Sequence, residues 1–448
     1  MSANRTALIL AHADKRIPRY TSYPTAPHFG PGVTQDTYRT WLSGIRSGTP
    51  VSLYVHVPFC RTMCWYCGCN TRATLRNEPL ERYLDTLEME LNLLSRALPS
   101  VLPLKHLHWG GGSPSLVRAA RFRGIMQRIR RSFAFKRDAE VALEVDPRHL
   151  CDELVDAMAE TGVNRVSLGV QTFDEKVQRA INRVQPFETV ADAFARLRAG
   201  GIEGVNADLL YGLPLQTVDG VIETTDRLLE LTPDRISVFG YAHVPHMKPH
   251  QRMIREEDLP DAAGRLAQAD AIAERLVSGG YRQIGLDHFA RADDPMARAL
   301  ESGRLRRNFQ GYTTDEAPVL LGVGASAIGS LPEGYVQNDA ATENWRREII
   351  DGRFAIARGL ALDGDDRMRR EIIERIMCDL TVDLAALAAA HGRPAPEADL
   401  AALEADGIVR RDGDRIVVAE AFRPLSRVVA AAFDARLNLG PARHAVAV

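Results

Sequence analysis

The sequence predicts an α/β chain whose central part is a partial, open (β/α)6 barrel. An N-terminal arm precedes the barrel, and a small, mainly helical, winged-helix-like domain follows it. Six short runs rich in Val, Ile and Leu alternate with longer amphipathic segments between residues 51 and 290, as in parallel strands joined by helical crossovers. Reactive and polar side chains follow the ends of these runs, where (β/α) barrels place their catalytic groups. A doubly wound sheet is the generic alternative, but this placement at one rim favours the barrel.

The first expected strand covers residues 51–57. Its residues alternate, and Leu53 and Val55 lie on the opposite face from Tyr54 and His56. Pro58 ends the strand because proline cannot donate to a sheet ladder. The five later strands are expected at residues 105–109, 141–146, 166–171, 205–210 and 235–239. Helical spacing of apolar residues predicts helices over residues 80–94, 174–198 and 218–231.

Six strand–helix units are two fewer than a closed barrel needs, so we expect a lateral mouth wide enough for a bulky substrate. We divide the chain into an arm (1–50), the barrel (51–290), a barrel extension that covers the substrate (291–362) and the C-terminal domain (363–448). Residues 19–27 are expected to be extended, since residues before proline avoid helical angles. In the C-terminal domain, residues 403–418 have the pattern of a helix followed by a tight hairpin.

Composition excludes several classes of function. The 448 residues are 45% hydrophobic and 25% charged, which supports a sizeable core. A net charge of −2 gives no positive electrostatic field that would attract nucleic acid. We therefore assign the winged-helix-like domain a packing or covering role. No run approaches the roughly 20 apolar residues of a membrane span. We expect a cytoplasmic monomer with reduced thiols, in which Cys151 and Cys378 are buried structural residues.

Four of the six cysteines lie between residues 60 and 69 and form the pattern CxxxCxxCxC. Three closely spaced thiolates can each ligate one iron of a [4Fe–4S] cubane, and the fourth iron is then open to another ligand. A structural zinc site is the main alternative, but such sites usually take paired cysteines from two separated turns. No second CxxC pattern follows in this sequence.

Polar residues also follow the later strands. The Gly110–Gly112 run lets the backbone approach a ligand closely, although a tight turn would explain it equally well. Glu144, Gln171 and Asp208 lie at or near the ends of three successive strands. A buried carboxylate must be paired or hydrogen-bonded, so the three residues together favour a polar ligand over internal bonding alone.

The cysteine motif resembles that of the radical S-adenosylmethionine (SAM) superfamily, whose signature is CxxxCxxC. Within that superfamily, YVHVPFCRTMCWYCGCN resembles the oxygen-independent coproporphyrinogen III oxidase (coproporphyrinogen dehydrogenase) family. RYTSYPTA, HWGGGSP, EVDP, GVNRVSLGVQ, DLLYGLP, LDHFAR and NFQGYTT extend the resemblance over nearly the whole chain. Ser113 stands where the family often has threonine, another small hydroxyl residue.

The resemblance implies roles for individual residues. It implies that the iron ligands are Cys60, Cys64 and Cys67 and that the catalytic residues are Tyr54, His56 and Cys69, with no settled role for Cys69. His56 would orient SAM or transfer a proton; a merely hydrogen-bonded barrel histidine is the alternative. The implied SAM contacts are Tyr54, Tyr66, Gly111, Gly112, Ser113, Glu144, Gln171, Arg183 and Asp208, with Ala242 and Ile328 contacting a second SAM.

The resemblance further implies anaerobic oxidative decarboxylation of two propionate side chains of coproporphyrinogen III to vinyl groups, which gives protoporphyrinogen IX in haem biosynthesis. The reaction would use one or two SAM molecules, a 5′-deoxyadenosyl radical and a reducing donor such as flavodoxin or ferredoxin. The alternatives are a haem-binding trafficking protein on the same barrel, a radical SAM methyltransferase and a zinc-only module. Trafficking relatives usually lack the fourth cysteine and the NFQGYTT segment, and both are present here.

Overall fold

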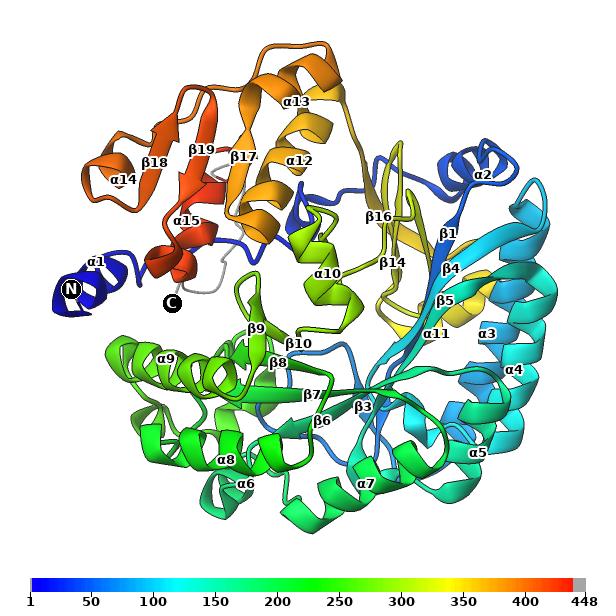
Figure 1. Cartoon of the computed structure of the whole chain (residues 1–448). Helices are drawn as coiled ribbons and strands as arrows, with labels where there is room; N and C mark the ends of the chain where they lie inside the picture. Colours follow the sequence, from blue (N-terminus) through cyan, green and yellow to red (C-terminus); the bar gives the residue numbers. More distant parts are fainter. Residues whose placement is uncertain (1, 438–448) are drawn as a thin grey trace.

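The computed structural model describes residues 2–437, whose centre is a twelve-stranded sheet (Figure 1). Seven neighbouring strands of this sheet are parallel. In spatial order the sheet consists of β16 (Ile356–Ala361), β15 (Gly334–Asn338), β14 (Ile328–Leu331), β13 (Val319–Val323), β1 (Val51–Val57), β4 (Leu102–Gly111), β5 (Phe133–Val145), β6 (Arg165–Gln171), β7 (Gly204–Tyr211), β8 (Arg235–Gly240), β10 (His288–Arg291) and β9 (Tyr281–Ile284).

All six expected strands are present, as β1 and β4 to β8, and they pair in parallel in sequence order. The sheet does not stop near residue 290. Strand β13 adds a seventh parallel strand beside β1, with Val51 opposite Val319, and β14 to β16 continue antiparallel from there. At the other edge, β10 and β9 also run antiparallel.

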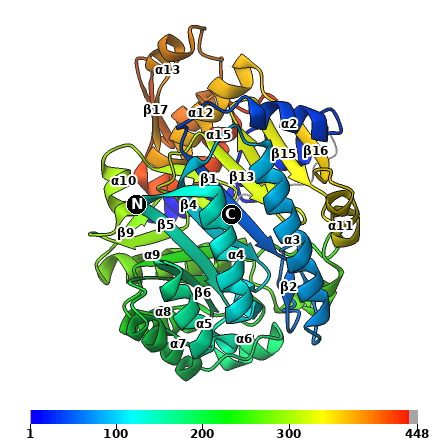
Figure 2. The same cartoon turned by 90° about the vertical axis from the view of Figure 1, so that its right-hand side faces the viewer.

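Helices cover one face of the sheet, and Figure 2 shows α3 and α4 running side by side there. Buried residues of the α3 helix, such as Leu84 and Leu87, belong to one hydrophobic core with Leu53 and Leu107 of the strands. The helices of this part are α3 (Glu78–Ala97), α4 (Ala119–Ser132), α5 (Asp152–Glu160), α6 (Glu175–Ala180), α7 (Phe187–Ala199), α8 (Val218–Glu230), α9 (Ala262–Ser278), α10 (Pro295–Glu301) and α11 (Thr342–Ile350).

The single helix predicted over residues 174–198 is wrong. Two helices, α6 and α7, are separated by residues 181–186. Pro186 is the N-cap of α7, and proline disfavours a helical residue before it. Asn182, with φ of +54°, lies in the left-handed region inside the break. This interruption moves Arg183 off a helix surface and into the interior, where it is 7% exposed.

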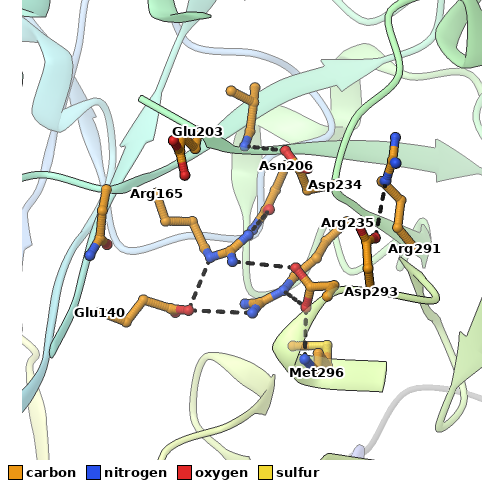
Figure 3. Close-up of polar contacts among 12 residues, drawn as sticks. Glu140, Arg165, Glu203, Asn206, Asp234, Arg235, Arg291, Asp293 and Met296 are labelled. Carbon is orange, nitrogen blue, oxygen red and sulfur yellow. Dashed lines mark hydrogen bonds and ion pairs between the residues drawn. The ribbon is translucent and has the colours of Figure 1, made fainter. Parts of the chain in front are cut away.

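Buried ion pairs fill the concave side of the sheet near the amino ends of its strands (Figure 3). Arg165 donates to Glu140 at 3.0 Å and to Asn206 at 2.8 Å, and Arg235 lies 3.3 Å from the same Glu140 carboxylate. Burial alone would raise the pKa of Glu140, but Arg235 and Arg165 hold it at about 2. This network closes the end opposite the reactive residues, and therefore leaves the carboxyl end as the open one.

The N-terminal arm and the C-terminal part share a second hydrophobic core. The arm contains two helices that the sequence did not predict, α1 (Ser2–Leu10) and α2 (Gln35–Ser43). Ile9, Tyr20 and Tyr23 pack in that core with α12 residues such as Ile372. The C-terminal elements are α12 (Gly364–Asp379), β17 (Thr381–Asp383), α13 (Leu384–His391), α14 (Ala401–Ala405), β18 (Val409–Asp412), β19 (Arg415–Val418) and α15 (Ser426–Ala431).

The expected helix and hairpin of the C-terminal part correspond to α14, β18 and β19. Residues 438–448 of the predicted domain lie outside the described residues. Cys378 is buried as predicted, but Cys151 is exposed beside the start of α5, so its predicted burial is wrong. Within residues 2–437 no helix is both long and apolar enough to span a membrane.

Candidate active site

The cysteine loop begins in the short strand β2 (Phe59–Cys60), which pairs with β3 (Arg72–Ala73). Segments distant in sequence hold the loop backbone. Asn182 donates to the Met63 carbonyl at 2.9 Å, and the Lys248 ammonium donates to the Cys69 carbonyl at 2.8 Å. His250 Nε2 lies 2.7 Å from the Cys67 carbonyl, which can only accept, so Nε2 carries the proton. The loop is therefore fixed from two sides.

One cavity at the carboxyl end of the strands brings the predicted residues together. It contains about 790 Å³ of space, part of which is open to solvent. The sequence-predicted residues that line it are Cys60, Cys64, Tyr66, Cys67, Cys69, Gly111, Gly112, Ser113, Glu144, Gln171, Arg183 and Asp208. Tyr54 and His56 lie directly behind this lining. Strands β1 and β4 to β7 thus contribute to one site.

The glycine run is required by the protein's own packing. A β-carbon on Gly110 would lie 2.7 Å from the Glu144 carboxylate, and one on Gly111 would lie 2.6 Å from the His56 ring. Gly111 also has φ of +117°, which side-chain-bearing residues rarely adopt. A β-carbon on Gly112 would lie 2.6 Å from the Phe59 carbonyl. These glycines let the turn pack against Glu144 and the cysteine loop, so close approach to a ligand is not their only purpose.

Glu144 is bonded on both carboxylate oxygens. Gly111 N–H donates to Oε2 at 3.1 Å, and His108 Nε2 donates to Oε1 at 3.0 Å. Burial raises the pKa of Glu144, but these two bonds outweigh it and hold the pKa below its usual value. Glu144 is thus an ionised acceptor at the edge of the cavity.

Asp208 and Gln171 extend the polar wall. Ser167 donates to Asp208 at 3.1 Å, and burial, with the nearby Glu144 charge, raises the pKa of Asp208 to about 6. Gln171 has φ of +69°, in the left-handed region. Such strain in a residue without a glycine's freedom is concentrated at functional sites. It occurs here where the Gln171 side chain joins the cavity lining.

Arg183 is the buried cation of the site. Its guanidinium donates to the Gly169 carbonyl at 2.7 Å and lies 3.5 Å from Asp146 and 3.6 Å from the Cys64 sulfur. Its Nε is buried without a hydrogen-bond partner among the described residues. Arg148 forms the other, shorter ion pair with Asp146 at 2.6 Å. Arg183 is therefore positioned to meet an anionic group in the cavity.

Tyr54 and His56 form a hydrogen-bonded pair. Burial lowers the pKa of His56, so the ring is neutral. Its Nε2 lies 3.1 Å from the Asn70 carbonyl and must donate there, which makes Nδ1 an acceptor. The Tyr54 hydroxyl, 2.9 Å from Nδ1, is then the donor. His56 thus fixes the orientation of Tyr54.

The thiols of Cys60 and Cys67 differ in their surroundings. Burial raises the pKa of Cys60 to about 11, although the Thr71 hydroxyl, 3.2 Å away, opposes this shift. A hydrogen bond from the Cys69 thiol is the main cause that lowers the pKa of Cys67 to about 6. Cys69 therefore supports a thiolate on its neighbour.

Ala242 and Ile328 do not line the cysteine cavity. Ala242 lies in an adjacent cavity rich in arginine. Ile328, at the start of β14, packs against the cluster of Phe29, Tyr335 and Leu362. Their assignment to a second SAM stays a prediction.

Comparison with known proteins gives consistent matches along the chain. The oxygen-independent coproporphyrinogen III oxidase of Bradyrhizobium diazoefficiens is 52% identical over 450 residues, which cover 99% of this chain and 100% of that protein. The chain belongs to the oxygen-independent coproporphyrinogen III oxidase family. The relative from Paracoccus denitrificans is 43% identical, with 97% of each chain covered.

Structural comparison supports the same family. Coproporphyrinogen III oxidase (HemN) from Escherichia coli, described as a radical SAM enzyme, matches with a TM-score of 0.88 and 36% identity. The match covers 94% of this chain and all of that one. A radical SAM superfamily model matches residues 54–228, and a HemN C-terminal domain model matches residues 362–421.

Membership in this radical SAM family implies a [4Fe–4S] cluster and SAM, and the cavity fits both. Four cysteine thiols line the cavity and could ligate iron. Within residues 2–437, no three His, Cys, Asp or Glu side chains are grouped around one metal-ion position. A cubane needs a different arrangement, in which each thiolate ligates its own iron. The buried guanidinium of Arg183, with its unpartnered Nε, fits the carboxylate of an amino acid.

Several supporting residues of this family member were not predicted. Asp146 and Arg148 fix Arg183, His108 fixes Glu144, and Lys248 and His250 hold the cysteine loop. Gln251 also donates to the Tyr66 carbonyl at 3.0 Å and the Ala242 carbonyl at 3.2 Å. For Lys248, His250 and Gln251, the signal that could have indicated these contacts is the run of charged and amide residues after the sixth strand, HVPHMKPHQ.

Proposed function

We propose that this chain converts coproporphyrinogen III to protoporphyrinogen IX without oxygen, by oxidative decarboxylation of two propionate side chains in haem biosynthesis. The observation that carries the proposal is the convergence of Cys60, Cys64 and Cys67 with Glu144 and Arg183 on one cavity at the carboxyl end of the sheet. Each propionate loses a hydrogen atom, CO₂ and one electron, which an external acceptor takes. Two such turnovers consume two SAM molecules.

When bound, the cluster and SAM supply the 5′-deoxyadenosyl radical that removes the hydrogen atom from the propionate. Cys60, Cys64 and Cys67 would hold three irons. Arg183 would hold the methionine carboxylate, because it is a buried cation with unused donor capacity. Ionised Glu144 and Asp208 would accept hydrogen bonds from the amino and hydroxyl groups of the cofactor.

Tyr54 and His56 fix the positions of protons beside the cavity. Tyr54 directs its only proton to His56 Nδ1, and His56 Nε2 donates to the Asn70 carbonyl, so the neutral ring would orient a ligand through Tyr54 and would hold a further proton only by giving up the Tyr54 hydrogen bond. We place the enzyme in the cytoplasm as a monomer, with a reductant such as flavodoxin or ferredoxin. The cytoplasm keeps the thiols reduced and supports cluster assembly.

Anaerobic product analysis tests this function. Reconstituted protein is incubated with coproporphyrinogen III, SAM and dithionite, and the tetrapyrrole products, methionine and 5′-deoxyadenosine are quantified. We expect protoporphyrinogen IX together with two equivalents of 5′-deoxyadenosine. Cys64→Ser should abolish both products. Cys151→Ser, which changes an exposed cysteine outside the cavity, should retain wild-type activity.

Other products would support the alternative functions. Stable haem binding without 5′-deoxyadenosine or a vinyl product would indicate a trafficking protein, and a methylated product would indicate a methyltransferase. Either result would contradict the proposal. A colourless protein after anaerobic reconstitution, without the broad visible absorption of a cluster, would indicate a zinc-only module and would also contradict it.

A further inference from the structure

A second cavity lies beside the cysteine cavity and is lined by arginines from distant parts of the chain. It lies where α9 faces α1 and α15, next to the β8–β10–β9 edge of the sheet (Figure 1). Three acidic residues also line it: Asp270, which pairs with Arg5; Glu420, which pairs with Arg423; and Asp287, which pairs with His288. The lining arginines are Arg5, Arg19, Arg265, Arg307, Arg423 and Arg427.

Among these arginines, Arg265 has the least satisfied guanidinium. No carboxylate of the described residues lies within ion-pair distance of Arg265, and its buried Nε has no hydrogen-bond partner there. Burial lowers the pKa of Arg265, and the Arg19 charge adds to that effect. A partly buried guanidinium without a counter-charge in ion-pair distance is costly for folding alone. The arrangement therefore fits a site whose anion is supplied by a ligand.

The surroundings of Arg265 are shaped to accommodate it. Its guanidinium lies 5.6 Å from the centre of the Tyr211 ring. A β-carbon on Gly212 would overlap Nη1, and one on Gly240 would lie 3.0 Å from Nη2. Both glycines follow or end strands of the site, β7 and β8. The chain thus keeps space free for this side chain at the carboxyl end of the sheet.

Neighbouring arginines extend the positive surface. Arg19 of the N-terminal arm donates to the Gly240 carbonyl at 3.1 Å. Arg307 donates to the Tyr20 carbonyl at 3.1 Å, and its Nη1 is buried with no hydrogen-bond partner in the part of the chain that the structure describes. These hydrogen bonds use neutral carbonyls. Asp287 interacts electrostatically with both guanidinium groups, but among the described residues it forms its ion pair with His288 and not with either arginine. Phe239 and Phe289 add apolar surface to the same cavity.

The two cavities share wall elements, although no lining residue is common to both. Ala242 lines the arginine cavity, and its carbonyl accepts from the same Gln251 amide that bonds Tyr66 in the cysteine loop. Strand β7 contributes Asp208 to the cysteine cavity and Tyr211 to the arginine cavity. Both cavities therefore lie against the carboxyl half of β7, and a ligand that fills both would react beside the cysteine loop and hold its other groups among the arginines.

We propose that the arginine cavity binds carboxylate side chains of the tetrapyrrole substrate that are not reacting, with Arg265 as the principal anchor. The ligand class is an amphipathic polycarboxylate, whose macrocycle contacts the apolar wall and whose carboxylates pair with guanidinium groups. This inference rests on the proposed function, because that function supplies the four-propionate substrate. The other carboxylate available at this site is that of SAM, and the test distinguishes the two.

The test is equilibrium binding of coproporphyrin III, the oxidised tetracarboxylate, to the reconstituted full-length protein, followed by porphyrin fluorescence. SAM affinity is measured separately by calorimetry. Arg265→Gln should weaken coproporphyrin binding by about tenfold or more, since it removes a charged hydrogen-bond donor. SAM affinity should stay within about twofold of wild type. The coproporphyrin affinity of Arg265→Lys should lie between those of wild type and Arg265→Gln, because lysine keeps the charge but not the planar guanidinium.

Arg131→Gln is the matched control, since Arg131 is an exposed arginine on α4 outside both cavities. Arg19→Gln provides a second test if Arg265→Gln fails to fold, and thermal unfolding identifies that case. A porphyrin with two carboxylates should show a smaller difference between wild type and Arg265→Gln.

Equal coproporphyrin affinity in Arg265→Gln and Arg131→Gln would overturn the inference. A loss of SAM affinity with unchanged porphyrin affinity would overturn it too, since the site would then serve SAM. Failure of the proposed function has a different signature, because wild-type protein would then give no protoporphyrinogen IX. If the wild type turns over but coproporphyrin binding is too weak to measure, an unchanged KM for coproporphyrinogen III in Arg265→Gln refutes the inference.

Discussion

Gly111→Ala tests whether the glycine turn is held by the contacts described above. An L-residue forced to positive φ costs roughly 1–2 kcal/mol, and Gly111 has φ of +117°. The new β-carbon would lie 2.6 Å from the His56 ring, so His56 must move away from Tyr54 and Asn70. Each lost hydrogen bond adds about 1 kcal/mol. We therefore expect the free energy of unfolding to fall by roughly 3–4 kcal/mol.

The assay is urea unfolding under anaerobic conditions, with Gly201→Ala as the control. Gly201 also has positive φ, +80°, but a β-carbon there meets no atom within 4 Å. The control therefore measures backbone strain without the collision. We also expect Gly111→Ala to lose SAM affinity, because the Gly111 N–H supports Glu144. If the two variants lose the same stability, within about 0.5 kcal/mol, the collision with His56 does not matter and the reasoning fails.

Two further predictions concern titrating carboxyl groups. Burial raises the pKa of Glu90 from 4.5 to about 7, so the folded protein retains a proton that the unfolded chain has lost. The free energy of unfolding should then fall as pH rises from 4.5 to 7. In urea titrations, Glu90→Gln should reduce this fall by about 3 kcal/mol. If the free energy of unfolding of Glu90→Gln depends on pH as steeply as that of wild type, the prediction is contradicted. With Asp208 titrating at about pH 6, SAM affinity measured by calorimetry should rise between pH 5 and 7. Asp208→Asn should bind SAM about tenfold more weakly, without that rise, and affinity equal to wild type at pH 7 would refute this.

The barrel strands could be predicted because their signals are local. Each of the runs that became β1 and β4 to β8 is apolar over a few residues and ends in turn formers or polar groups. The parallel pairing of β13 with β1 could not be found this way, since 268 positions separate Val51 from its partner Val319. Pairing over such a distance depends on the folded chain, and no local pattern records it.

The same distinction applies to the site. The cysteine motif and the polar strand ends are local patterns, and the structure gathers them in one cavity. Arg183 was expected on a helix, yet the break before Pro186 turns it inward. The arginine cavity had no signal at all, because Arg19, Arg265 and Arg307 come from three distant segments and only the packing of arm, sheet edge and C-terminal part brings them together.

Mössbauer spectroscopy of ⁵⁷Fe-reconstituted protein tests the central claim most directly, namely that Cys60, Cys64 and Cys67 leave one iron of the cluster open to SAM. The account predicts that adding SAM changes the isomer shift of one iron in four and leaves the other three as they were, in wild type and in Cys69→Ser alike. The account would be contradicted if SAM changed the isomer shift of none of the four irons. It would also be contradicted if Cys69→Ser could not assemble the cluster.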